Sequence, residues 1–206
     1  MRLEPFTLTG RHVVLEPLSR QHAAGLLRAA REDRSSYGFT SVPSEPAEMD
    51  AYIDWLLADA ERDLVVPFVQ RRAADGALVG CTRFLNVTWW AGRDLPTEVE
   101  VGGTWLSASA QRTAINTEAK LLLLGHAFDV WQVHRVAICT DARNERSRRA
   151  IERIGATFEG VLRRHRASMG DATVPGSPRD TAVFSVVVDE WPAVRAALRS
   201  RLERDG

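Results

Sequence analysis

Two segments of the sequence combine polar side chains with backbone features that suit catalysis or anion binding. The first is EVEVGGTWL, residues 98–106, in which Glu100 precedes the pair Gly102-Gly103. Side chains alternate along a strand, so Glu100 and Thr104 are expected on the same face, toward a cleft or solvent. A glycine pair in a strand is typical of a bulge or of a backbone that a ligand approaches closely. A purely structural bulge is the plainer interpretation.

The second segment is QRTAINTEAK, residues 111–120, which joins that strand to an expected helix. The first turn of a helix presents unpaired N–H groups and the positive end of the helix dipole, so it can bind an anion. Arg112, Thr113 and Thr117 place further donors around this turn. An ordinary helix start, capped by Thr113 or Asn116, is the alternative.

A third polar cluster lies in TDARNERSRRAIERIGA, residues 140–156. Asn144 and Ser147 are three residues apart and therefore fall on one face of a helix. Asn can pair with an amide of an extended ligand, and Ser can donate a hydrogen bond or a proton. Capping of the helix by Asp141 or Asn144 is again the alternative.

The elements that must position these clusters follow from periodicity and turn signals. Strands are expected at residues 11–18, 64–71, 78–85, 98–106, 135–140, 157–166 and 181–188. Helices are expected after Ser19, from residue 47, and at residues 116–130, 144–154 and 191–203. This order predicts an α/β (mixed α+β) fold with helices on both faces of a mixed sheet. Residues 1–206 show no repeat or dividing linker, so one domain is expected.

The composition of the chain limits the classes of binding partner and the cellular compartment that are expected. Lys plus Arg and Asp plus Glu number 27 each, which argues against a nucleic-acid or anionic-membrane partner. Lys120 is the only lysine. Cys81 and Cys139 lie in apolar runs and are expected to be reduced thiols. With neither a signal core nor a stretch of ~20 apolar residues, a cytoplasmic protein is expected. No metal site is predicted.

Three parts of the chain together resemble the GNAT acetyltransferases, and within them the RimL-like group that acetylates protein N-termini and small amines. They are residues 98–106 with 111–128, residues 135–165 and residues 179–194, and NERSRRAIERIGA is the most specific run. The resemblance implies a mostly antiparallel mixed sheet that is splayed between its fourth and fifth strands, 98–106 and 135–140. It also implies an enzyme that transfers an acetyl group from acetyl-CoA to a primary amine by direct attack in a ternary complex.

The resemblance assigns a role to each polar cluster. Glu100 would take the proton of the attacking amine, and Ser147 would protonate the departing thiolate. His165 is a second candidate base. The implied acetyl-CoA-binding residues are Thr104, Trp105 and Leu106 for the pantetheine arm, Arg112, Thr113, Ala114, Ile115, Asn116 and Thr117 for the pyrophosphate, and Asn144 and Ser147 near the arm and thioester.

One departure from the family pattern concerns the phosphate loop, which usually reads Q/R-x-x-G-x-G/A. Here Ala114 and Asn116 occupy the two small positions. Ala114 adds a methyl group where backbone and phosphate approach closely, and Ala disfavours positive φ. A non-catalytic relative that binds coenzyme A as a sensor or partner protein is therefore the alternative function.

The amine acceptor, a peptide N-terminus or a small molecule, is left open by the sequence. The loops 32–46, 86–96 and 169–178 are expected to frame its pocket, with Phe39, Trp89 and Trp90 as an apolar or aromatic wall. The assembly state, a homodimer included, is also open.

Overall fold

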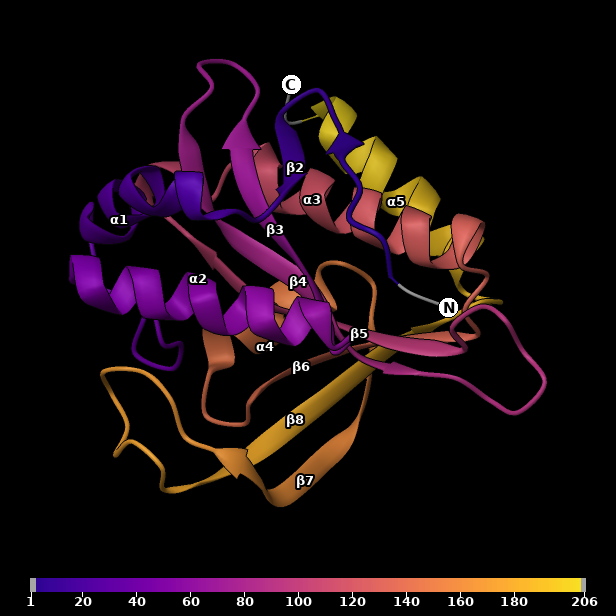
Figure 1. Cartoon of the computed structure of the whole chain (residues 1–206). Coiled ribbons are helices and arrows are strands. Elements are labelled where there is room, and N and C mark those ends of the chain that lie inside the picture. The colour runs from indigo at the N-terminus through magenta and orange to yellow at the C-terminus, as the bar shows by residue number, and fades with distance from the viewer. Residues whose placement is uncertain (1–2, 205–206) are drawn as a thin grey trace.

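The computed structural model describes residues 3–204. In this part of the chain eight strands form one sheet in the order β1-β2-β3-β4-β5-β6-β8-β7 (Figure 1). Neighbouring strands are antiparallel except for β5 and β6, which are parallel. The strands are β1 Leu8–Thr9, β2 Val13–Pro17, β3 Val65–Arg72, β4 Leu78–Thr88, β5 Glu98–Leu106, β6 Arg135–Asp141, β7 Thr157–Ala167 and β8 Pro178–Val187.

Helices cover both faces of the sheet (Figure 1). They are α1 Ala23–Arg31, α2 Pro46–Glu61, α3 Ala114–Gly125, α4 Glu145–Glu152 and α5 Trp191–Arg204, with short 3-10 turns at Arg20–His22 and Ala108–Ala110. The apolar faces of α1 and α2, with Leu26, Ile53 and Leu56, pack in one core cluster with Trp105 of β5. The helices α3 and α5 pack in another, which contains Val101 of β5. No helix among residues 3–204 is both long and apolar enough to cross a membrane.

Most of the predicted elements are observed, and β5 has the predicted bounds. The short strand β1 was not expected, so the predicted fourth and fifth strands are β5 and β6. The expected helix at 116–130 begins at Ala114 and is α-helical only to Gly125. Its last residues form a π-helical turn, His126–Val130. The change coincides with Gly125, a residue type that weakens the α-helix.

Candidate active site

The strands β5 and β6 separate after the first three residues of each. Their register contains three pairs, the last of which joins Glu100 to Ala137. Beyond that pair β5 stays bonded to β4 and β6 to β8, and a cavity of about 1910 Å³ opens beside them. Both strands, the first turns of α3 and α4, and residues from 34–44 and 166–176 line this cavity. The predicted splay of the sheet is therefore confirmed.

A bulge in β5 changes the direction of the side chains that follow it. The register with β4 is interrupted after Gly102, and Gly103 has φ of 57°. Thr104 consequently points toward α3, where its Oγ1 accepts a hydrogen bond of 2.7 Å from Nζ of Lys120. The prediction that Glu100 and Thr104 share a face is wrong, because the extra residue of the bulge reverses the alternation.

The loop before α3 ends in a side-chain cap. Thr113 is the N-cap, and its Oγ1 accepts a hydrogen bond of 3.3 Å from the N–H of Ile115, so Asn116 is not the cap. Arg112 adopts the positive φ of this loop, 61°. Ala114, by contrast, is the first residue of α3. Because Ala114 is helical, this position does not need the conformational freedom of glycine. The N–H groups of the first turn are therefore available to an anion with alanine at this position.

The helix α4 begins beside this loop. Asn144 is its N-cap, and Oδ1 of Asn144 accepts a hydrogen bond of 3.0 Å from the backbone N–H of Ser147. Arg146, in the first turn, donates a hydrogen bond to the side chain of Gln111 just before α3. Both helix starts line the same large cavity. Because the cap uses the backbone N–H of Ser147, its hydroxyl is not committed to capping.

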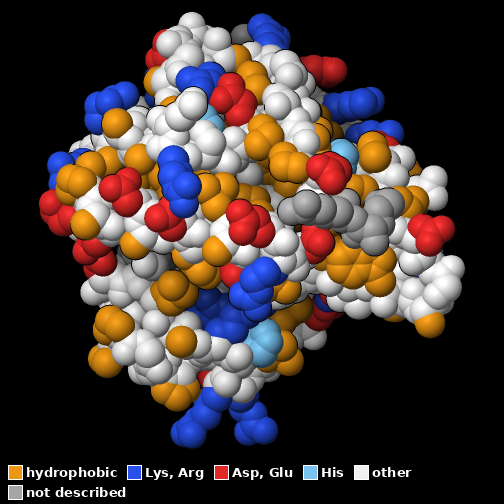
Figure 2. All heavy atoms as spheres, in the orientation of Figure 1, with side chains coloured by type: hydrophobic (Ala, Val, Ile, Leu, Met, Phe, Trp, Pro, Cys, Tyr) orange, Lys and Arg blue, Asp and Glu red, His pale blue; other side chains and the backbone are white. Residues whose placement is uncertain are grey.

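Basic side chains gather in the large cavity. Figure 2 shows Lys and Arg side chains at the floor of a hollow below α2. The arginines that line the cavity include Arg112 before α3, Arg146 and Arg149 of α4, and Arg166 and Arg179 of the β7–β8 hairpin. Arg149 pairs with Glu145 and Arg166 with Glu100. Arg112 and Arg146 lie at the helix starts, where guanidinium groups suit the phosphates of an elongated ligand.

Glu100 lies at the point where the strands separate. The residue is 5% exposed, and its carboxylate accepts hydrogen bonds of 3.1 and 2.6 Å from Nη1 and Nη2 of Arg166 in β7. Asn86 of β4 donates a third, at 2.7 Å. The contact with Glu100 raises the pKa of Arg166. A carboxylate fixed in this way can accept a proton or orient a water molecule. No local pattern in the sequence links Arg166 to Glu100, so the sequence alone does not predict this pair.

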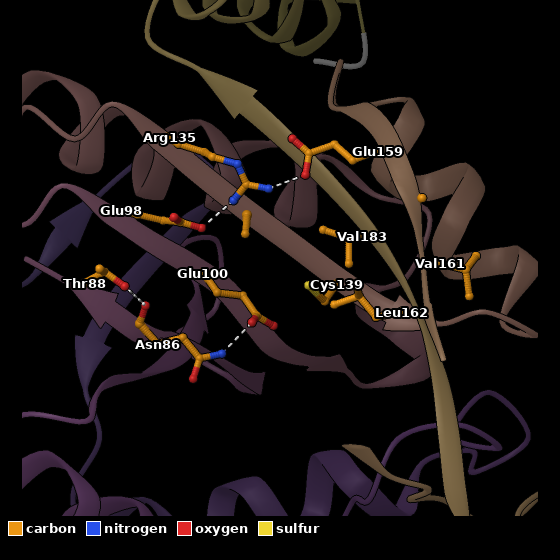
Figure 3. A pocket seen from close by; sticks show the side chains of 12 residues that line it. Asn86, Thr88, Glu98, Glu100, Arg135, Cys139, Glu159, Val161, Leu162 and Val183 are labelled. Atoms are coloured by element: carbon orange, nitrogen blue, oxygen red, sulfur yellow. Dashed lines mark hydrogen bonds and ion pairs between the residues drawn. The ribbon is translucent and has the colours of Figure 1, made fainter. Parts of the chain in front are cut away.

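A second cavity, of about 590 Å³, shares Glu100 with the first (Figure 3). In its wall the guanidinium of Arg135 bridges the carboxylates of Glu98 and Glu159 (Figure 3). Cys139 also lines both cavities. Glu100 and Cys139 therefore lie where the walls of the two cavities adjoin.

Some residues predicted to line the acceptor pocket or to act as the base lie outside both cavities. Trp89 and Trp90 line neither cavity, whereas Phe39 lines the larger one. His165 is exposed and lines neither cavity. Its neighbour Arg166 points inward instead, since adjacent residues of a strand face opposite sides.

The two cysteines are free thiols, as expected. Burial raises the pKa of Cys81 and of Cys139 to about 12 in each case. A thiol with so high a pKa carries almost no thiolate at neutral pH, so neither cysteine is suited to act as a nucleophile.

The acetyltransferase (GNAT) domain matches residues 12–157, more than half of the chain. The chain belongs to the GNAT acetyltransferase family. A GCN5-related N-acetyltransferase from Brucella melitensis is 31% identical, with a TM-score of 0.83 over 98% of this chain and 87% of that one. An acetyltransferase structure from T. thermophilus is 35% identical, with a TM-score of 0.81 over 98% and 100% of the two chains.

A further relative agrees with the RimL-like grouping. YdaF of Bacillus subtilis (strain 168), provisionally named a ribosomal N-acetyltransferase, is 29% identical over 145 residues, which are 65% of this chain and 73% of YdaF. Mycobacterium smegmatis RimJ, solved in complex with CoA-disulfide, shares the fold at 24% identity, with a TM-score of 0.75 over 96% and 95% of the chains.

Membership of this family makes the chain an acetyl-CoA-dependent acetyltransferase. Acetyl-CoA, when bound, supplies a thioester whose carbonyl carbon an amine can attack. The structure fits this cosubstrate in three respects. The large cavity extends from the first turn of α3 to Glu100, arginines line it, and Ala114 sits in the helix without positive φ.

Proposed function

We propose that the chain transfers the acetyl group of acetyl-CoA to a primary amine by direct attack within a ternary complex. The observation that carries this proposal is the position of Glu100, which lines both cavities. The larger cavity suits the cosubstrate because it contains the helix starts and the arginines. The smaller cavity offers the acceptor a separate approach to the same carboxylate, so both substrates can be present together.

Within this proposal Glu100 is the general base and Ser147 the general acid. Arg166 and Asn86 hold the carboxylate in place, which supports proton transfer because the base must be aligned with the amine. The Ser147 hydroxyl lies at the start of α4, on the cavity, where it could protonate a leaving thiolate. The proposed cosubstrate contacts are Thr104, Trp105, Leu106, Arg112, Thr113, Ala114, Ile115, Asn116, Thr117, Asn144 and Ser147.

A protein N-terminus is the first acceptor class to test. The ribosomal N-acetyltransferase name of YdaF supports it. The lining of the smaller cavity holds three carboxylates, of Glu98, Glu100 and Glu159, against one guanidinium, of Arg135, and this excess of negative charge favours an ammonium group. Small-molecule amines form the second arm of the same test.

The test measures release of the CoA thiol from acetyl-CoA with a panel of N-terminal peptides and small amines. Glu100→Gln is expected to lower turnover by about a hundredfold or more, because an amide cannot accept the proton. Glu16→Gln is the matched control. Glu16 makes a similar pair with Arg71, at 2.7 and 2.8 Å, but lines neither cavity. Equal turnover of the two variants would refute the role of Glu100, and no thiol release with any amine would refute the transfer.

A further inference from the structure

Lys120, the only lysine of the chain, lines the large cavity from α3. It is 4% exposed. Its Nζ donates a hydrogen bond of 2.7 Å to Oγ1 of Thr104, which in turn pairs with Oγ1 of Thr82 at 2.8 Å. Both neighbours are neutral. No ion pair to Lys120 is found among residues 3–204, and burial is the cause that shifts its pKa.

This environment is unusual for a lysine with a purely structural role. A buried ammonium without a carboxylate partner destabilises the fold, and an apolar side chain of the same length would avoid that cost. Burial lowers the pKa of Lys120 to about 7. Near neutral pH the side chain is therefore the neutral amine in a substantial share of the molecules. A desolvated, neutral lysine is a nucleophile.

Lys120 also lies between two parts of the large cavity, the first turn of α3 and Glu100. It follows Ala114 by six residues, which places it about 9 Å along the helix axis from the anion-binding turn. Its partner Thr104 is on the stretch of β5 beyond the last pair with β6, between Glu100 and the end of the strand. Along β5 the amine therefore lies between the anion-binding turn and the proposed base, on the side of the sheet that α3 covers.

We propose that Lys120 is a site of self-acetylation, at which its ε-amine takes the acetyl group from acetyl-CoA bound in the same cleft. The proposal rests on the acetyl-CoA-dependent activity described above. The lone pair of Nζ attacks the thioester carbonyl carbon, the new C–N bond forms, and the C–S bond breaks. One proton of the amine passes to the leaving thiolate. The products are Nε-acetyl-lysine and free CoA, and nothing is oxidised or reduced.

Acetylation of Lys120 has a consequence for the cleft. It removes the titratable amine and adds an amide and a methyl group to a side chain that lines the large cavity. Interior packing tolerates added atoms poorly, so the acetylated chain should bind acetyl-CoA more weakly. Self-acetylation would then inhibit acetyl transfer to the acceptor amine when the acceptor concentration is low.

The first test incubates the whole chain with acetyl-CoA without an acceptor and follows intact mass, with peptide mapping of Lys120. We expect one acetyl group on Lys120, absent from Lys120→Arg, and Lys120→Met provides the same control if the Arg variant fails to fold. The urea-unfolded chain should react at least about tenfold more slowly, because it lacks the bound geometry. Equal rates in the folded and unfolded chains would show ordinary chemical acetylation and overturn the proposal.

A second test does not depend on acetyl transfer. Acetic anhydride should label Lys120 in the folded chain, and CoA without an acetyl group should protect it if the amine faces the cosubstrate. Lack of protection, under conditions where CoA raises the melting temperature, would overturn the proposal. If acceptor amines are acetylated while Lys120 is not, this inference fails and the proposed function stands. If neither Lys120 nor any acceptor is acetylated, the proposed function fails as well.

Discussion

Replacing Lys120 by Met should stabilise the folded chain, by an amount that depends on pH. Burial lowers the pKa of this lysine from 10.5 to about 7. At ~1.4 kcal/mol per pKa unit, keeping the charged form buried costs on the order of 4 to 5 kcal/mol. Met has a similar length and no charge, so it removes this cost and keeps most of the packing.

The sign of the pH dependence follows from the lowered pKa. Above 10.5 the amine is neutral in both the folded and the unfolded chain, so the penalty vanishes. Between 10.5 and about 7 only the unfolded chain holds the proton, and the wild type loses ~1.4 kcal/mol per pH unit as the pH falls. Below about 7 both states are protonated and the penalty is constant. The advantage of the Met variant should therefore shrink by about 2 to 3 kcal/mol between pH 7 and pH 9.

Urea unfolding, followed by tryptophan fluorescence at several pH values, measures this difference. Other titrating groups contribute equally to both proteins and cancel in the comparison, and equal m-values would show that both unfold the same surface. Lys120→Arg is the opposing control, since a guanidinium stays charged and should destabilise the chain throughout. A Met variant whose free energy of unfolding differs from that of the wild type by the same amount at every pH would refute the reasoning.

Four further outcomes are expected. Ser147→Ala should lower kcat about tenfold to a hundredfold with little change in the affinity for CoA, and an unchanged kcat would leave Ser147 only its place in the helix start. Glu100→Gln should abolish or move the acid limb of the pH–rate profile, and a normal limb at normal rate would direct attention to bulk water as the base. Ala114→Gly should cost a few tenths to ~1 kcal/mol of stability without tightening CoA binding, so a large gain in affinity would show that the native Ala is strained. Acetyl-CoA at ~100 times its Kd should add about 2.7 kcal/mol, a melting shift of roughly 5 to 10 °C for a chain of this size, and no shift at millimolar concentration would remove acetyl-CoA as the ligand.

Local signals in the sequence were sufficient for much of the framework that holds the site. The strand with Glu100 was predicted with its observed bounds because alternation and a glycine pair mark both its course and its irregularity. Thr113 and Asn144 were each among the predicted helix caps, since a cap is decided by residues only two or three positions away. The position of Ala114 in the helical region follows from the same local chemistry.

Tertiary structure decided which groups these elements bring together. Arg166 reaches Glu100 across 66 positions of sequence, and only the order of strands in the sheet places the two side by side. The direction of the Thr104 side chain depends on whether β5 has a bulge, with one extra residue opposite β4, at the glycine pair. A bulge is a property of the paired strands and not of one strand alone. That reversal places Thr104 against Lys120. Periodicity predicts which face a side chain occupies from its neighbours along the sequence. The burial of the Lys120 amine depends instead on atoms contributed by every element that packs around it.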